Sequence, residues 1–503
     1  MTIPHKKIHP RLIENKLHLL IIAFILLVGF FFRSYNSFEW FEYAHDGDLY
    51  SWIVKDIVVD KHPRLIGQLT TAPGIFIGPL FYYMLIPFFL LTRMDPVGAI
   101  IPITIIGILT VLSYYYVFSK LFNREIGLIA AFLYATLLSL VYLDRRVVPS
   151  TPTNIWLIWY FYGIVMLVRG KFSVFPLLGL LTGLIWHIHI ALAPALIAIP
   201  TALLLSGKIP KLKDSLLFFL GFIPPSLPLI LFEVRHNFVQ TINFLSNFTA
   251  EHGGGTGLAK FNLVIIKFTE DINRLFFYPQ TLPLINHTLF FVLLLLSAIF
   301  LVKKNLLKIK EVIVFYIWIG TIILFYTFSS TILSEYYFAN TEIIFLTFVA
   351  LLIYLLYSSG KIGKYITLAL LLLLLTKNAF HFVKTDIYQK GYNERKSAAA
   401  YITEDAHKKG LPCVSVSYIT TPGENVGFRY FFWLKNLHIT QIQEGSATYT
   451  IVLPPELAEG VPMKLFGHIG VIDPEKIPTQ AELNKSCSGL NTNLTDSLFG
   501  FTR

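Results

Sequence analysis

Long apolar stretches alternate with short polar or basic stretches along most of the chain. Residues 17–32, 102–117 and 368–375 contain almost no charged side chain. A helix needs about 20 apolar residues to cross a bilayer, and fewer where the bilayer is thin or distorted. The repeated pattern therefore predicts a polytopic α-helical membrane protein.

Basic clusters between the apolar stretches predict an orientation, because Lys and Arg accumulate in cytoplasmic loops. One threading puts every such cluster on the cytoplasmic side, with the N-terminus inside and the C-terminus outside. It has eleven crossings, within an expected range of about 11 to 13 transmembrane helices. The predicted crossings are residues 17–32, 97–117, 126–142, 154–168, 174–187, 190–206, 215–232, 288–302, 312–329, 338–357 and 365–381.

Residues 74–92 are apolar but do not fit this threading, because a full crossing here would invert the charge pattern that follows. The segment holds Gly74, Gly78, Pro79 and Pro87. Broken backbone is tolerated at membrane depth only inside protein or along a cavity. We therefore interpret it as a re-entrant or interfacial segment.

The first apolar stretch resembles a signal peptide, because Lys6, Lys7 and Arg11 precede it. No small-residue cleavage site follows it, and such a site is what marks a cleaved signal peptide. The stretch is therefore interpreted as a retained first span.

Composition agrees with a membrane protein. Hydrophobic residues make up 55% of the 503 residues and charged residues only 14%, against about 25% charged residues in an average soluble domain. This excludes a disordered chain and argues against an ordinary soluble enzyme. The net charge of +11 does not indicate a nucleic-acid partner, because most basic clusters lie between apolar stretches and topology explains them.

Two domains are expected. The first is a transmembrane domain over residues 1–383, including the outer loops 33–73 and 233–287, and the second is a small extracytoplasmic α/β domain over residues 384–503. Residue patterns in the second domain predict both helix and strand. Its expected elements are a helix near residues 395–408 and strand-like stretches at residues 413–420, 449–453 and 469–472.

The chain has only two cysteines, Cys413 and Cys487, and both fall in the second domain. An oxidising compartment outside the cytoplasm would let them pair. Their spacing does not reveal their geometry, so the sequence leaves the disulfide open.

Asp46 and Asp48 form the first candidate site, in the outer loop after the first span. Two carboxylates this close together near a membrane surface are able to hold a divalent metal, or to poise one of them as a general base. The alternative is a solvated turn, because Asp-Gly-Asp is also ordinary turn chemistry.

Arg145 and Arg146 form the second candidate site. They lie in the one short outer loop that carries adjacent arginines, against the positive-inside bias. Guanidinium groups bind phosphate through two parallel hydrogen bonds. The alternative is an ion pair with Asp144 or contact with lipid headgroups.

Three further polar patches lie at the outer ends of predicted crossings, where an interfacial belt of aromatic and polar residues is the alternative explanation. All five candidate sites fall on one predicted face of the membrane. This favours a single site in which aromatic rings stack on a sugar and arginine clamps a phosphate. The three further patches are His187 and His189; Glu233, Arg235 and His236; and Glu335, Tyr336 and Tyr337.

The order of these features resembles the GT-C superfamily of membrane glycosyltransferases, and within it glycosyltransferase family 39, which includes the protein O-mannosyltransferases and the lipid A aminoarabinose transferases. Residues 46–50 followed by Lys55 resemble that family's Asp-Glu-x-x-Tyr pattern followed by Arg, with Gly47 in place of Glu. Residues 78–83 are similar to its Pro-Leu-Tyr-Tyr-Tyr segment, and residues 232–238 to a Phe-Asp-Leu-Arg-His-Asn-Phe pattern.

The resemblance implies an inverting transferase that moves a hexose or pentose from a polyprenyl-phosphate donor to a hydroxyl of a lipid, glycan or protein acceptor. Asp46 is the expected base and Asp48 the second catalytic carboxylate. Several family members carry another Asp before a Pro in the next outer loop, where this chain has Thr151, and Asp144 is the alternative. No cofactor is implied with certainty, and a divalent metal is left open. The expected substrate-binding residues are Tyr50, Lys55, Tyr82, Tyr83, Arg145, Arg146, His187, His189, Glu233, Arg235, His236, Glu335, Tyr336 and Tyr337.

The resemblance also implies a place in the cell: a multi-pass protein of the plasma or inner membrane that serves cell-envelope glycosylation, with no nucleic-acid partner. Two other functions stay open. A lipid-linked glycan ligase or oligosaccharyltransferase of the same superfamily would share the site. A polytopic transporter would place ionisable residues near the bilayer midplane.

Overall fold

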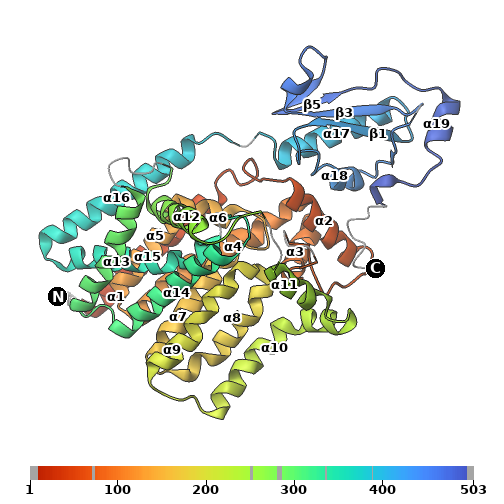
Figure 1. The fold of residues 1–503 in the computed structure, drawn as a ribbon. Coiled ribbons are helices and arrows are strands. Elements are labelled where there is room, and N and C mark those ends of the chain that lie inside the picture. The colour runs from red at the N-terminus through yellow and green to blue at the C-terminus, as the bar shows by residue number, and fades with distance from the viewer. Residues whose placement is uncertain are drawn as a thin grey trace, which may run out of the picture.

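The computed structural model describes residues 10–70, 74–249, 253–279, 286–334, 337–387, 389–443 and 445–494. Most of these residues form a helical body, and a small α/β unit follows at its C-terminal end (Figure 1). The expected fold class, a helical polytopic membrane protein with a small C-terminal α/β unit, is confirmed. The helices of the body are α1 (Pro10–Ser34), α2 (His45–Val58), α3 (Leu80–Leu91), α4 (Ile100–Leu121), α5 (Arg124–Thr136), α6 (Leu138–Arg145), α7 (Thr153–Val168), α8 (Phe175–Ile188), α9 (Ala198–Ser206), α10 (Leu212–Arg235), α11 (Val239–Thr249), α12 (Leu258–Phe277), α13 (His287–Lys303), α14 (Ile309–Phe328), α15 (Glu342–Ser358) and α16 (Lys361–Lys384), with short 3₁₀ turns η1 (Pro96–Ala99), η2 (Phe172–Val174), η3 (Ile190–Ile197) and η5 (Ala339–Thr341).

Six helices of the described chain are long and apolar enough to cross a membrane, and a seventh crossing results if α5 and α6, bent by 63°, count as one. The other apolar helices have 10–17 residues. Four of the eleven predicted crossings fall on these shorter helices, so the full threading and its orientation stay predictions. The six candidate spans are Lys16–Ser34, Pro96–Leu121, Leu212–Arg235, Ile309–Phe328, Ala339–Ser358 and Lys361–Lys384.

The segment that did not fit the threading contains α3, a helix of 12 residues with Pro87 inside it. At 1.5 Å per residue, a helix of this length extends about 18 Å, against about 30 Å for the hydrocarbon core. It is therefore too short to cross, in agreement with a re-entrant or interfacial segment.

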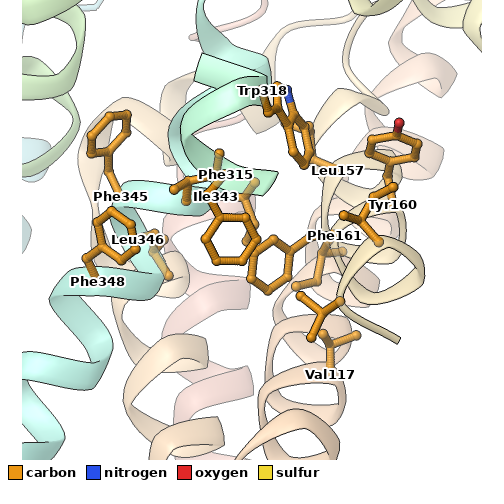
Figure 2. Packing of buried hydrophobic residues seen from close by; sticks show 14 of the residues in the cluster. Val117, Leu157, Tyr160, Phe161, Phe315, Trp318, Ile343, Phe345, Leu346 and Phe348 are labelled. Carbon is orange, nitrogen blue, oxygen red and sulfur yellow. The ribbon is translucent and has the colours of Figure 1, made fainter. Parts of the chain in front are cut away.

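Helices α7, α14 and α15 form the centre of the body, where aromatic and branched side chains pack against one another (Figure 2). Phe161 stacks on Phe315 with 5.2 Å between the ring centroids, and Tyr160 meets Trp318 edge to face at 5.2 Å. These helices are apolar on every side, as expected for helices surrounded by other helices or by lipid. The packing fixes the body that carries the connecting loops.

Glycines allow α8 and α10 to approach closely. A Cβ added at Gly179 would lie 1.9 Å from the carbonyl oxygen of Phe218, and one added at Gly221 would lie 2.2 Å from that of Pro176. Membrane helices associate through such small residues, because lipid supplies no hydrophobic drive between helices.

The C-terminal unit is a five-stranded sheet in the order β2-β1-β3-β5-β4. Strand β1 pairs in parallel with β2 and β3, and β5 pairs antiparallel with β3 and β4. The expected helix and strands agree with α17, β1, β3 and β5, and Cys413 and Cys487 form a disulfide. The elements are α17 (Tyr392–Lys408), β1 (Val414–Thr420), α18 (Arg429–Leu434), β2 (Ile439–Thr440), β3 (Thr448–Leu453), β4 (Lys464–Phe466), β5 (Ile469–Ile472) and α19 (Gln480–Ser486).

Polar contacts attach the α/β unit to the body, where α18 packs against α2 (Figure 1). Asp95, after α3, accepts hydrogen bonds from the Tyr392 hydroxyl and the Lys396 ammonium, each at 2.5 Å. The Tyr430 hydroxyl donates to the carbonyl oxygen of Met94 at 2.9 Å. Helix α2 therefore lies between the body and the α/β unit.

Candidate active site

A cavity of about 670 Å³ opens beside α2, and we name it the larger cavity. One face of α2 lines it, together with residues of the stretches 64–70, 74–77, 146–154 and 188–192. Its volume lies within the range of about 300–1,000 Å³ that is typical of small-molecule sites. Its wall combines apolar side chains with a small set of polar ones, which are His45, Asp46, Arg64, Gln68, Thr70, Arg146, Ser150, Thr151, Thr153, Asn154 and His189.

Asp46 reaches the larger cavity from the first turn of α2. It shares its helix face with Leu49 and Ile53, because residues three and seven positions along a helix lie on one side. The Gln68 side-chain amide donates to Asp46 Oδ1 at 3.3 Å. Asp46 is therefore a partly exposed carboxylate at the cavity wall, with one neutral hydrogen-bond donor beside it.

Tyr82 holds Gln68 in place. Its buried hydroxyl accepts from the Gln68 backbone N–H and donates to the Gln68 side-chain oxygen, both at 3.0 Å. The loop comes this near only because Gly67 has no side chain, since a Cβ there would lie 2.2 Å from the Tyr82 ring. Tyr82 thus positions the loop that carries Gln68 and does not line the cavity itself.

Asp48 lies on another face of α2 and points to the α/β unit. Its Oδ1 accepts from the backbone N–H of Tyr430 at 3.1 Å. Burial raises the pKa of Asp48 to about 6, although this hydrogen bond and the charge of Arg429 act against the rise. The structure therefore does not bring the two predicted catalytic carboxylates together.

The two adjacent arginines also separate. Arg145 donates to the carbonyl oxygens of Phe32 and Tyr35 at 2.9 Å each, at the end of α1, and its guanidinium lies 5.4 Å from the centre of the Trp40 ring. Arg146 is exposed, and its side chain has no ion-pair or hydrogen-bond partner in the described part of the chain. Of the two, only Arg146 lines the larger cavity.

Asp144 is buried and fully engaged. It pairs with Arg33 at 2.6 Å, accepts from the Tyr134 hydroxyl at 2.7 Å and accepts from the Asn154 amide at 3.3 Å. A buried carboxylate in such a network stabilises the junction of α1 and α6. It is not in the cavity and does not replace the missing second carboxylate there.

The sequence reasoning missed Arg64 and Gln68. Arg64 lines the larger cavity and pairs with Asp56 through Nε at 2.6 Å. The Tyr83 hydroxyl bonds to both the backbone N–H and the carbonyl oxygen of Arg64, at 2.9 and 3.1 Å. Only their position in the predicted outer loop could have pointed to these residues, since no short pattern marks them.

His189 lines the larger cavity and His187 does not. His187 is buried, and its ring contacts the carbonyl oxygen of Pro225 at 2.6 Å and accepts from the backbone N–H of Leu80 at 3.3 Å. The His189 ring accepts from the backbone N–H of Ala191 at 3.0 Å. Burial lowers the pKa of His189 to about 4, so the ring is neutral near pH 7.

The patch that follows α10 supports a neighbouring loop and does not line the cavity. Glu233 accepts from the backbone N–H groups of Gln240 and Thr241, both at 3.0 Å, and so caps α11. His236 stacks on Phe232 at 4.1 Å. Arg235 is exposed and lines neither this cavity nor the smaller one described below.

The remaining predicted residues lie elsewhere. Tyr50 is buried in the apolar cluster around α2. Lys55 pairs with Asp60 at 2.7 Å and lies 5.9 Å from the ring centres of Trp52 and Trp433, towards the α/β unit. Tyr337 stacks on Tyr326 at 5.0 Å, and Glu335 and Tyr336 lie outside the described residues.

A second cavity of about 360 Å³, the smaller cavity, adjoins the first. Leu143, Arg146 and Ala339 line both of them. Parts of the α1–α2 loop, α6, α12 and the start of α15 form the rest of its wall. Arg146 therefore lies at the boundary between two adjoining cavities.

A metal centre was left open by the sequence. Among the described residues, no group of three or more His, Cys, Asp or Glu side chains is arranged to hold a metal ion. Asp46 and Asp48 point to different parts of the molecule, so they do not form a two-carboxylate metal site.

The larger cavity thus lies within the helical body beside α2, with the carboxylate of Asp46 and the guanidinium of Arg146 in its wall. Residues 73–230 match the family model of the dolichyl-phosphate-mannose-protein mannosyltransferases. A comparison with curated protein sequences finds no match.

The fold is similar to that of ArnT from Cupriavidus metallidurans. The crystal structure bound to undecaprenyl phosphate gives a TM-score of 0.55 at 10% sequence identity, covering 90% of this chain and 97% of that chain. The apo structure gives 0.52 at 9% identity, covering 91% and 98%. The chain therefore has an ArnT-like fold, in agreement with the predicted resemblance to the GT-C superfamily, and the family match lies within the helical body.

Proposed function

We propose that the chain transfers a hexose or pentose from a polyprenyl-phosphate donor to a hydroxyl group of an acceptor, with inversion at the anomeric carbon. The observation that carries the proposal is that Asp46 and Arg146 line the same cavity. One supplies a base and the other an unpaired cation, which are the two groups that such a displacement needs.

The reaction is a single displacement. The acceptor oxygen forms a bond to the anomeric carbon while the bond from that carbon to the phosphate oxygen breaks. Asp46 takes the hydroxyl proton as general base. The lipid phosphate leaves with the electron pair, and Arg146 stabilises its negative charge. A phosphate is a good leaving group, so the mechanism assigns no acid to it.

The cavity wall also supports a lipid donor. Leu49, Ile53, Phe76, Ile77 and Leu192 give it a continuous apolar part. Exposed apolar side chains on α10 and α16 face outwards from the body, where lipid would surround them. In the ArnT structure that the fold resembles, the bound molecule is undecaprenyl phosphate. A prenyl chain would contact the apolar side chains of this wall.

The same proposal predicts how the protein is oriented in the membrane. Helix α2 lines the larger cavity with one face and contacts the α/β unit with another, so both would face the outside of a plasma or inner membrane, with the N-terminus in the cytoplasm. A lipid, a glycan or a protein on that side would supply the acceptor hydroxyl. A cysteine label placed near Gly423 should react from outside in intact cells, and exclusive reaction from the cytoplasm would contradict this orientation.

Transfer from a labelled polyprenyl-phosphate sugar to an acceptor extract tests the function directly. Asp46→Asn should lower turnover by about 10²–10⁴-fold, the usual contribution of general base catalysis. Asp48→Asn is the matched control, because Asp48 lies outside the cavity, and it should stay within a few-fold of the wild type. Near-full turnover in Asp46→Asn would show that Asp46 is not the base.

Arg146→Gln tests the phosphate contact. It should lower turnover by about 10²-fold, as expected when one group that stabilises transition-state charge is removed. Arg235→Gln is the control, because that arginine is exposed and lines neither cavity. Equal losses in the two variants would contradict the role of Arg146.

A further inference from the structure

The smaller cavity has no role in the displacement described above, yet its wall is unusual for a membrane protein. Three acidic side chains, Glu42, Asp271 and Glu342, line it together with Arg145, Arg146 and Arg274. Acidic and basic groups are costly near a bilayer, and those that are kept there commonly mark a functional site. The charged lining therefore indicates a binding surface.

Aromatic rings form one side of this cavity. Trp40 stacks on Tyr142 with 5.6 Å between centroids and 14° between planes, and Tyr278 meets Tyr142 edge to face at 5.5 Å. These three residues come from the α1–α2 loop, from α6 and from the end of α12. Flat apolar rings of this kind contact the C–H faces of a bound ring through dispersion and burial.

The wall of the smaller cavity also contains a buried carboxylate oxygen that has no hydrogen-bond partner in the described structure. Glu342 begins α15, and its Oε2 is buried with no hydrogen-bond partner among the described residues. Asp271 and Arg274, one turn apart on α12, are its charged neighbours. A buried polar atom that stays unsatisfied carries a free-energy cost of about 1–3 kcal/mol. A ligand that donates a hydrogen bond to Glu342 would remove that cost.

We propose that the smaller cavity binds a polyhydroxylated sugar ring, with its hydroxyl groups on Glu342, Asp271 and Arg274 and its C–H groups against the aromatic side of the cavity. The ring belongs either to the acceptor or to the sugar carried by the donor, and the chemistry of recognition is the same. The volume of about 360 Å³ lies at the lower end of small-molecule sites. This inference rests on the proposed transfer reaction.

The position of Arg146 connects the two cavities. Because it lines both, a sugar in the smaller cavity would lie next to the phosphate that Arg146 is proposed to hold in the larger one. In this proposal the larger cavity holds the lipid phosphate beside the base Asp46, and the smaller cavity holds a neutral sugar ring.

Steady-state kinetics with Glu342→Gln test the inference, with donor and acceptor concentrations varied separately. The change keeps the shape of the side chain and removes its charge. The KM for one sugar-bearing substrate should rise about tenfold while kcat changes less than threefold. A rise for the acceptor assigns the ring to the acceptor, and a rise for the donor assigns it to the donor. Unchanged KM values for both would overturn the proposal.

Two further variants keep the test decisive if Glu342→Gln folds poorly. Thr385 lines the smaller cavity but not the larger one, so Thr385→Trp fills it from the rim and should raise the same KM. Glu39→Gln is the matched control, because Glu39 is exposed and lines neither cavity, and it should leave both KM values unchanged.

A binding experiment separates this inference from the reaction itself. Methyl glycosides of several hexoses and pentoses, titrated into the purified full-length protein, should raise its thermal stability in the wild type and Glu39→Gln but not in Thr385→Trp. This outcome supports the sugar site even if wild-type protein fails to transfer, a failure that would count against the proposed function alone. No stabilisation by any glycoside would overturn the sugar site.

Discussion

Two faces of α2 differ in what they contact, although only one residue separates their carboxylates. Asp46, Leu49 and Ile53 face the larger cavity, whereas Asp48 accepts a hydrogen bond from the α/β unit and Lys55 lies against Trp433 of that unit. In a helix, residues two positions apart point in different directions. The helix can therefore hold a catalytic group and a docking group in the same turn.

The difference shows in the surroundings of each carboxylate. Asp46 has one neutral donor, Gln68, and an open cavity before it. Asp48 is held against a backbone N–H, and burial raises its pKa to about 6. The face of α2 towards the larger cavity, the cavity face, thus leaves Asp46 available. The face towards the α/β unit, the docking face, uses Asp48 to join two parts of the molecule.

The largest expected effect comes from the disulfide, which acts on the docking side alone. It joins Cys413 and Cys487 across 74 residues and holds α19 beside the start of β1. Replacing both cysteines by serine should lower the stability of the α/β unit by about 2–4 kcal/mol, because the unfolded unit gains freedom. Hydrogen exchange in β1 and β3 should accelerate, while exchange in α4 and α5 stays unchanged.

The turnover of the same cysteine-free variant tests whether a change in the α/β unit affects catalysis at the cavity face of α2. At a temperature where the α/β unit remains folded, the cysteine-free protein should transfer sugar at nearly the wild-type rate, because Asp46 and its donor belong to the body. A loss as large as that of Asp46→Asn under these conditions would show that the two faces are coupled.

The next effect is a pH dependence at Asp48. Its folded pKa of about 6 lies above the ordinary carboxyl value of 3.8, so between these values the folded protein binds more protons than the unfolded one. Stability therefore falls as pH rises through this window, by about 3 kcal/mol at 1.36 kcal/mol per pKa unit. The measurement is the free energy of unfolding of the α/β unit against pH.

Asp48→Asn is the control for this prediction. Its side-chain oxygen still accepts from Tyr430, but it has no proton to lose, so the fall in stability between pH 4 and pH 6 should disappear. An unchanged slope in this variant would show that Asp48 is not the titrating group.

The sequence predicted the helices and strands of the molecule better than the contacts between its side chains. Apolar length alone located α1, α4, α14 and α16, because membrane crossing depends on composition along a single segment. Strands β1, β3 and β5 were also anticipated, since alternation and β-branched residues act locally, whereas the short strands β2 and β4 were not. Pairing of Cys413 with Cys487 was left open, because sequence spacing does not show whether two residues meet.

The candidate site was predicted only in part. Asp46 and Arg146 reach the larger cavity, while their neighbours Asp48 and Arg145 serve structural contacts. Nothing local distinguishes the members of these pairs. Arg33, which directly follows the predicted crossing 17–32, pairs with Asp144 from 111 residues away, and such a partner is visible only once the chain is folded.

A smaller effect on the cavity side is expected from Tyr82→Phe. Loss of the hydroxyl releases Gln68 and leaves its backbone N–H without a partner, at a cost of about 1 kcal/mol. Turnover should fall about fivefold, with kcat lowered and KM unchanged, because the base is displaced while binding groups stay. Tyr50→Phe is the control, since the Tyr50 hydroxyl has no hydrogen-bond partner in the described structure, and a similar loss there would refute the role of Tyr82.

The smallest effect is expected at Lys55, which the family pattern suggested as a substrate contact. Its ion pair with Asp60, whose side chain is 44% exposed, is worth less than about 1 kcal/mol, because solvent screens such pairs. Lys55→Gln should therefore leave turnover within twofold of the wild type and shift stability only slightly. A tenfold loss of turnover, with the donor KM raised, would show that a charge on the docking face reaches the substrate, and the division of α2 into two faces would then be wrong.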